Sequence, residues 1–114
     1  MAHGIVVALS SDILPIGPMV GLYAAVTRKG MSGKVYGPDE AISIGKALRA
    51  YTQTGAFINF DEDIKGTLEP GKYADMIVLS DDILNIDAEQ ILEVEVLQTY
   101  MNGELVFAKA PTSN

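Results

Sequence analysis

The run of residues 4–10 limits what this chain can fold into more than any other feature. It reads Gly-Ile-Val-Val-Ala-Leu-Ser, so it is rich in β-branched residues and apolar on both faces. This pattern is typical of a strand buried on both sides in a parallel sheet. A closed barrel of eight strand–helix units takes about 250 residues, whereas this chain has 114 and predicts one such unit. We therefore expect the strand to find its partners on another copy of the chain, or on further polypeptide.

Helices are expected between this strand and residue 58. Residues 19–28 predict the helix that follows the strand. Pro38 presets the backbone for a first helical turn, and acidic residues after it suit the positive end of a helix dipole. A helix is therefore predicted to begin there. Its apolar stripe at helical spacing consists of Ala41, Ile44, Ala47, Leu48 and Tyr51. A second short helix is predicted through residues 55–58.

The second half of the chain predicts short strands joined by turns. Residues 69–71, Glu-Pro-Gly, have the chemistry of a turn, because proline presets φ and glycine accepts a positive φ. Residues 76–79 predict a short strand, and residues 88–92 predict one helical turn.

The most distinctive local pattern is a β-hairpin near the end. Two strand-like runs, 96–101 and 104–108, flank Asn102-Gly103, the pair favoured in a type I′ turn. Residues 109–114 predict a frayed tail.

Composition narrows the classes of function. The net charge of −7 argues against nucleic acid and against an anionic membrane surface as partners. The chain has no cysteine, which excludes disulfides, thiolate catalysis and cysteine-ligated zinc. The single histidine, His3, excludes a multi-histidine metal site built from one chain. The most apolar run near the start, residues 5–9, is too short to span a membrane, so a cytoplasmic setting is expected.

Asp12 is the candidate catalytic and metal-binding residue. It stands where the predicted strand ends and a loop begins, the edge at which α/β folds place their chemistry. A carboxylate at that edge can bind a metal or accept a proton. The alternative is an aspartate that caps a turn with its own side chain. Position alone favours this alternative.

Residues 66–72, Gly-Thr-Leu-Glu-Pro-Gly-Lys, match most of a phosphate-binding loop. The pattern requires serine or threonine next, where Tyr73 stands, and a helix where a strand is predicted. A tight turn is the better interpretation. The acidic residues 61–63 lack the spacing of a calcium loop and predict a solvated loop. Arg28 and Lys72 are interpreted as surface or packing charges.

The order of these segments resembles the C-terminal part of the amidohydrolase superfamily, in particular its family-three branch. Residues 66–79, containing Gly-Lys-Tyr-Ala-Asp and then Met-Ile-Val-Leu, carry the strongest likeness to the entry into the small β-sandwich domain. The other similar segments are residues 8–12 with Pro15, 24–28, 40–41, 46–52, 55–56, 96–99 and 101–106. The family's usual Gly-Ser-Asp stands here as Ser10-Ser11-Asp12.

The resemblance implies an α/β fold in three parts. Residues 1–59 would be the last strand–helix unit and the exit helices of a TIM-like barrel. Residues 60–108 would belong to a small composite β-sandwich ending in a hairpin, and residues 109–114 would form the tail.

The resemblance also implies a chemistry. In these enzymes the aspartate ending the eighth strand helps to bind a catalytic divalent metal, often zinc, and moves a proton; Asp12 matches it. The family's other metal ligands are absent, so we expect this segment alone to bind no metal and to be inactive. Its parent would hydrolyse carbon–nitrogen bonds of small amide-type substrates. The alternative function is a non-catalytic module, derived from the same domain, that serves structure or self-association.

Overall fold

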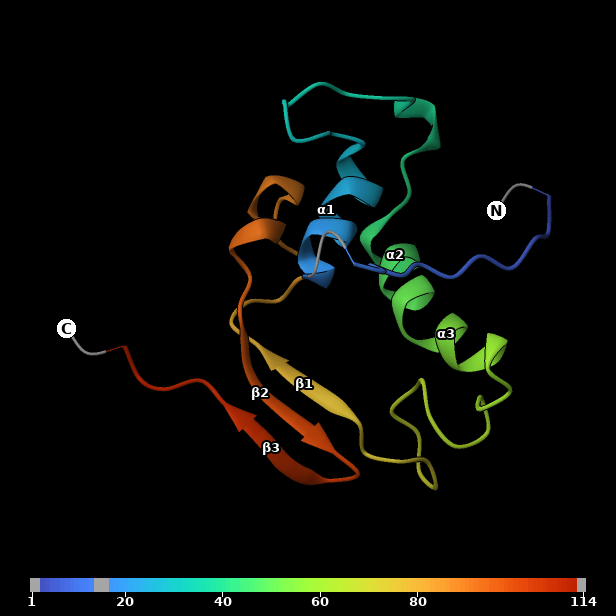
Figure 1. Ribbon diagram of the computed structural model, residues 1–114, viewed down its shortest axis with the longest axis vertical. Helices are drawn as coiled ribbons and strands as arrows, with labels where there is room; N and C mark the ends of the chain where they lie inside the picture. Colours follow the sequence, from blue (N-terminus) through green and yellow to red (C-terminus); the bar gives the residue numbers. More distant parts are fainter. Residues whose placement is uncertain (1–2, 14–16, 113–114) are drawn as a thin grey trace.

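The computed structural model describes residues 3–13 and 17–112 of the chain as an α/β fold (Figure 1). In Figure 1 the helices and a three-stranded sheet occupy different parts of the molecule, and the first residues run past α2. The elements, in chain order, are α1 (Pro18–Thr27), η1 (Pro38–Glu40), α2 (Ile44–Tyr51), α3 (Gln53–Ile58), β1 (Met76–Leu79), η2 (Ala88–Glu93), β2 (Val96–Met101) and β3 (Glu104–Ala108).

Helix α1 lies where the sequence predicts a helix, shifted by one residue. Pro18 occupies its first turn, where a missing amide costs nothing. The helix ends at Arg28, which adopts a left-handed backbone with φ 57°. The amide of Arg28 donates to the carbonyl of Ala24 at 2.9 Å, which satisfies one of the last carbonyls of the helix.

The helix predicted to begin at Pro38 is wrong in its start. Pro38 opens only the short 3-10 helix η1, and Ala41 returns to an extended backbone. Helix α2 begins at Ile44, because the Ser43 hydroxyl accepts a hydrogen bond from the amide of Lys46. The serine hydroxyl accepts a hydrogen bond from a free amide of the first turn. Proline has no side-chain acceptor that could do this. The following short helix, α3, covers the predicted residues 55–58.

The strand predicted over residues 4–10 is also wrong for this structure. These residues form no strand and pair with none among the described residues. Ile5 and Val6 are 66% and 57% exposed. A strand exists only through hydrogen bonds to a neighbour, and this part of the chain has no neighbouring strand in the described ranges. In place of the predicted strand, the structure has an extended segment that precedes α1 in the chain.

The buried core lies among the helices. It combines α1, α2 and the segment around η2, and its members are Leu22, Ala47, Ile83, Ile91 and Val94. Asp87 and Gln90 form a capping box at the start of η2, which fixes the helical turn that delivers Ile91 to this core. Segments from the two halves of the chain thus share one core.

The sheet has the order β1-β2-β3 and is antiparallel throughout. Its strands lie at the residues that the sequence predicts. Between β2 and β3, Asn102 and Gly103 have φ of 49° and 79°, the two positive values that a type I′ turn requires. All five residues of β3 are exposed, whereas Leu79 at the end of β1 packs against the helical core.

The molecule exposes more surface than its size requires. Its accessible surface is 8386 Å², whereas a folded monomer of 12.2 kDa exposes about 6,100 Å². Its radius of gyration is 15.3 Å, compared with about 13 Å for a compact domain of 100 residues. Exposed apolar side chains include Ile77, Val106 and Phe107 in the sheet.

Candidate functional site

Asp12 stands at the end of the extended N-terminal segment. Its backbone is left-handed, with φ 49°, a conformation that aspartate tolerates better than most residues. Its amide donates to the Ser10 hydroxyl at 3.4 Å, and its side chain is exposed. The turn-capping alternative would use the amide of residue 14; residues 14–16, which include Pro15, lie outside the described ranges.

The described residues do not form a metal site. No group of three histidine, cysteine, aspartate or glutamate side chains converges within residues 3–13 and 17–112. A catalytic zinc takes about three protein ligands, and Asp12 offers one carboxylate. His3 is exposed. A divalent metal therefore does not fit the donor set of these residues by themselves.

A large apolar groove lies beside the segment that leads to Asp12. It measures about 1050 Å³, slightly above the usual range of about 300–1,000 Å³ for ligand sites. One side is formed by residues 8–10 and another by α3, while the sheet contributes Ile77, Thr99 and Val106. Sequence reasoning did not find this groove, because its walls come from segments far apart in the chain.

The lysine of the turn at residues 66–72 bonds to side chains of the same turn. Lys72 Nζ donates to Thr67 Oγ1 at 2.8 Å and pairs with Glu69 Oε2 at 2.9 Å. Hydrogen bonding from Thr67, and then from Lys72, lowers the pKa of Glu69. The lysine that a phosphate would need is thus already paired with a carboxylate, and a strand follows. This geometry supports the tight-turn interpretation.

Gly66 has a specific packing role in this turn. Its φ is +98°, and a Cβ placed there would lie 2.6 Å from the Cβ of Ala56 in α3. Only glycine allows the turn to approach the helix this closely.

The other charged candidates have structural partners. Arg28 pairs with Glu40 at 3.2 Å and donates from Nε to the carbonyl of Tyr36 at 2.9 Å. Asp61 pairs with Lys65 at 3.0 Å. These contacts fit the interpretation of Arg28 and Lys72 as surface or packing charges. The acidic run was predicted as a solvated loop; Asp63 is exposed there, and Asp61 and Glu62 are partly buried.

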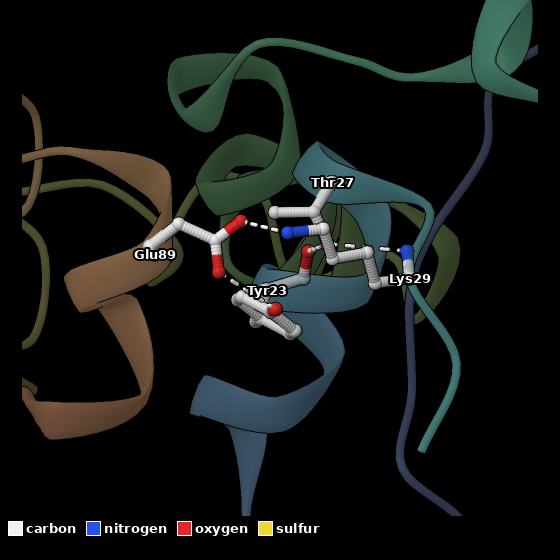
Figure 2. A network of polar contacts seen from close by, with 4 residues as sticks. All are labelled: Tyr23, Thr27, Lys29 and Glu89. Atoms are coloured by element: carbon white, nitrogen blue, oxygen red, sulfur yellow. Dashed lines mark hydrogen bonds and ion pairs between the residues drawn. The ribbon is translucent and has the colours of Figure 1, made fainter. Parts of the chain in front are cut away.

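A polar network joins α1 to η2 (Figure 2). Glu89 accepts a hydrogen bond from the Tyr23 hydroxyl at 3.0 Å and forms an ion pair with Lys29. The Thr27 hydroxyl donates to the carbonyl of Tyr23 at 2.7 Å and accepts from the amide of Lys29 at 3.2 Å. The hydrogen bond between Lys29 and Glu89 raises the pKa of Lys29 and lowers the pKa of Glu89. No local sequence pattern indicates this network, since Glu89 lies 60 positions beyond Lys29.

Comparison with known proteins places this chain in a family. Residues 1–107 match the Amidohydrolase family. The chain is 34% identical to a Bacillus subtilis (strain 168) protein named as amidohydrolase YtcJ, covering 96% of this chain and 22% of that protein. It is 35% identical to the N-substituted formamide deformylase of Arthrobacter pascens, covering 93% of this chain and 20% of the deformylase.

The crystal structure of an amidohydrolase from Thermotoga maritima MSB8 has the same fold over this region. The TM-score is 0.65 at 26% identity, covering 95% of this chain and 24% of that one. Sequence and fold together define the class as an amidohydrolase. The chain belongs to the Amidohydrolase family, and it spans about a fifth of the length of the curated relatives it matches. None of the helices in the described ranges has the length and apolarity needed to cross a bilayer.

Proposed function

We propose that this chain is the C-terminal part of a hydrolase that cleaves carbon–nitrogen bonds in small amide-type substrates, and that it is inactive alone. Family membership over residues 1–107 is the observation that carries the reaction class. The relative named for a substrate acts on N-substituted formamides, which contain such a bond.

In this proposal the chain has three parts. Residues 1–59 are the last unit and exit helices of a TIM-like barrel, residues 60–108 are part of a β-sandwich, and residues 109–114 are a tail. The shared core supports a fixed arrangement of the first two parts, because Leu22 and Ala47 from one pack with Ile91 and Val94 from the other.

Asp12 is the proposed catalytic carboxylate. It would accept a proton from the water that attacks the amide carbon, and return it to the nitrogen of the leaving amine. Its left-handed backbone supports this role, because unusual backbone conformations concentrate at functional sites. A well-placed general base contributes about 10²- to 10⁴-fold to the rate.

The divalent metal that the family implies, zinc in our proposal, does not fit the residues of this chain alone. Asp12 would supply one ligand of such a centre, and the remaining ligands would have to come from other polypeptide. Purified as 114 residues, the chain should therefore contain much less than one zinc per molecule by elemental analysis. Tight binding of one zinc per chain would contradict this.

The missing polypeptide would cover the apolar groove and the exposed sheet. Three-stranded sheets need a packed face for independent stability, and the faces of this sheet expose Ile77, Val106 and Phe107. We propose the remainder of the amidohydrolase fold as the occupant, since relatives carry about four-fifths of their length outside the matched region. Association with a second copy is the alternative outcome.

Reconstitution tests this function. The Arthrobacter pascens deformylase, expressed without its matching fifth, would be mixed with this chain and assayed on an N-substituted formamide. Each piece should be inactive, and the mixture should form a one-to-one complex that releases amine. A complex without activity would favour the non-catalytic module. A homodimer of this chain that ignores the deformylase piece would favour the self-association module.

A further inference from the structure

The carbonyl of Ala50 lies at the end of α2 and accepts a hydrogen bond from outside the helix. Ala50 is 1% exposed, so its carbonyl needs a partner within the protein. In an uninterrupted helix that partner would be the amide of Thr54, four residues later. Here the amide of Leu9 donates to this carbonyl instead, at 3.0 Å.

The break between α2 and α3 makes this acceptor accessible. Thr52 leaves the helical conformation, with φ −118° and ψ −83°. Its hydroxyl donates to the carbonyl of Leu48 at 2.8 Å, and its amide donates to Leu48 at 3.0 Å and to Arg49 at 3.3 Å. The amide and hydroxyl of Thr52 therefore have partners within α2, while the Ala50 carbonyl bonds to the N-terminal segment.

Leu9 is the point at which that segment is fixed. Before it, residues 5–7 line a shallow cavity of about 230 Å³ together with Arg49 of α2 and Thr54 of α3. After it, the Ser10 hydroxyl accepts from the amide of Asp12 at 3.4 Å. A short series of contacts thus runs from the end of α2 to the backbone amide of Asp12, the proposed catalytic residue.

We infer that the break between α2 and α3 positions Asp12 by presenting the Ala50 carbonyl to the amide of Leu9. Ala50, Thr52 and Leu9 are positioning residues. The importance of Asp12 for catalysis rests on the proposed function, whereas the fixed geometry of the segment does not.

Nuclear magnetic resonance of the 114-residue chain tests the geometry. The amide of Leu9 should exchange with solvent at least tenfold more slowly than those of Val6 and Val7. Leu9→Pro removes the donor, and Val7→Pro is the matched control in the same extended segment. In Leu9→Pro, residual dipolar couplings of Asp12 should no longer fit the orientation of α2, while those of the helices and sheet keep their values.

Two results would overturn the inference. One is a Leu9 amide that exchanges as fast as that of Val7, which can be measured in the unaltered chain even if a variant fails to fold. The other is unchanged couplings at Asp12 in a folded Leu9→Pro variant.

The reconstituted hydrolase provides a second readout. Leu9→Pro should lower kcat at least tenfold with KM changed less than threefold. A folded, assembled Leu9→Pro enzyme that keeps kcat within threefold of the parent would contradict a positioning role. Absence of activity with the unaltered chain would count against the proposed function alone, because the exchange and coupling measurements would still decide the geometry.

Discussion

The carboxylate of Asp75 holds the turn between β2 and β3: its Oδ1 accepts a hydrogen bond from the amide of Asn102 at 2.8 Å. Beside it, the carbonyl of Ala74 accepts from the amide of Gly103 at 2.9 Å. Lys72, in the same segment, closes the preceding turn with Glu69. The Gly-Lys-Tyr-Ala-Asp segment, which carries the strongest family resemblance, therefore acts as a structural clamp on the sheet.

Removing this clamp should destabilise the sheet. Asp75→Ala is expected to lower the free energy of unfolding by about 1 kcal/mol, because the hydrogen bond is exposed to solvent. Urea unfolding followed by circular dichroism measures the change. Asp63→Ala, in the acidic loop, is the control and should stay within about 0.5 kcal/mol of the parent. Equal stability of the two variants would show that the clamp contributes nothing.

Gly21 of α1 lies directly against the side chain of Tyr51 in α2. A Cβ at Gly21 would lie 1.7 Å from the hydroxyl oxygen of Tyr51 and 2.8 Å from its Cζ. Gly21→Ala should therefore cost about 1–3 kcal/mol through overpacking, although alanine normally favours a helix. Thermal unfolding measures the change.

Gly45 in α2 is the matched control, since a Cβ there meets nothing within 4 Å. Gly45→Ala should stabilise the protein by about 0.5–1 kcal/mol. Adding Tyr51→Leu to Gly21→Ala should recover part of the loss. Stabilisation by Gly21→Ala alone would refute this packing of the two helices.

The network at Glu89 predicts how stability depends on pH. The pKa of Glu89 is lowered from 4.5. Its contribution to the free energy of unfolding is therefore present above pH 4.5 and lost as the pH falls through the folded-state pKa. The pKa of Lys29 is raised from 10.5. Its contribution to the free energy of unfolding is therefore present below pH 10.5 and lost as the pH rises through the folded-state pKa. Unfolding in urea across pH 3 to 11 should show both losses.

Glu89→Gln should flatten both limbs of this curve. The acid limb should not vanish, because the lowered pKa of Glu69 contributes in the same direction. Glu104→Gln removes an exposed carboxylate from β3 and should leave the curve nearly unchanged. Identical curves for the two variants would contradict the role of the ion pair between Lys29 and Glu89.

The sequence predicts elements best where their cause is local. The turn at Asn102-Gly103 and the strands beside it lie at the predicted residues, because a two-residue turn sets its own strand pairing. The start of α2 differs from the predicted start at Pro38 because the Ser43 side chain caps the helix that begins at Ile44. The strand predicted over residues 4–10 does not form because a strand needs neighbouring strands, and the described part of the chain places none beside these residues.

The candidate site was predictable in part. Asp12 stays a prediction that rests on its place after an apolar run and on the family resemblance. The bond between Leu9 and Ala50 could not be predicted, since it depends on a helix break some 40 residues later. The groove and the Glu89 network likewise arise from segments that meet only in the folded chain.

Replacing one oxygen of Asp12 tests the central claim most directly. Asp12→Asn keeps the shape of the side chain and suits a left-handed backbone, but it cannot accept a proton. In the reconstituted hydrolase, kcat should fall by about 10²- to 10⁴-fold with an unchanged circular dichroism spectrum and complex stoichiometry. A folded, assembled Asp12→Asn enzyme that keeps kcat within threefold of the parent would contradict the account.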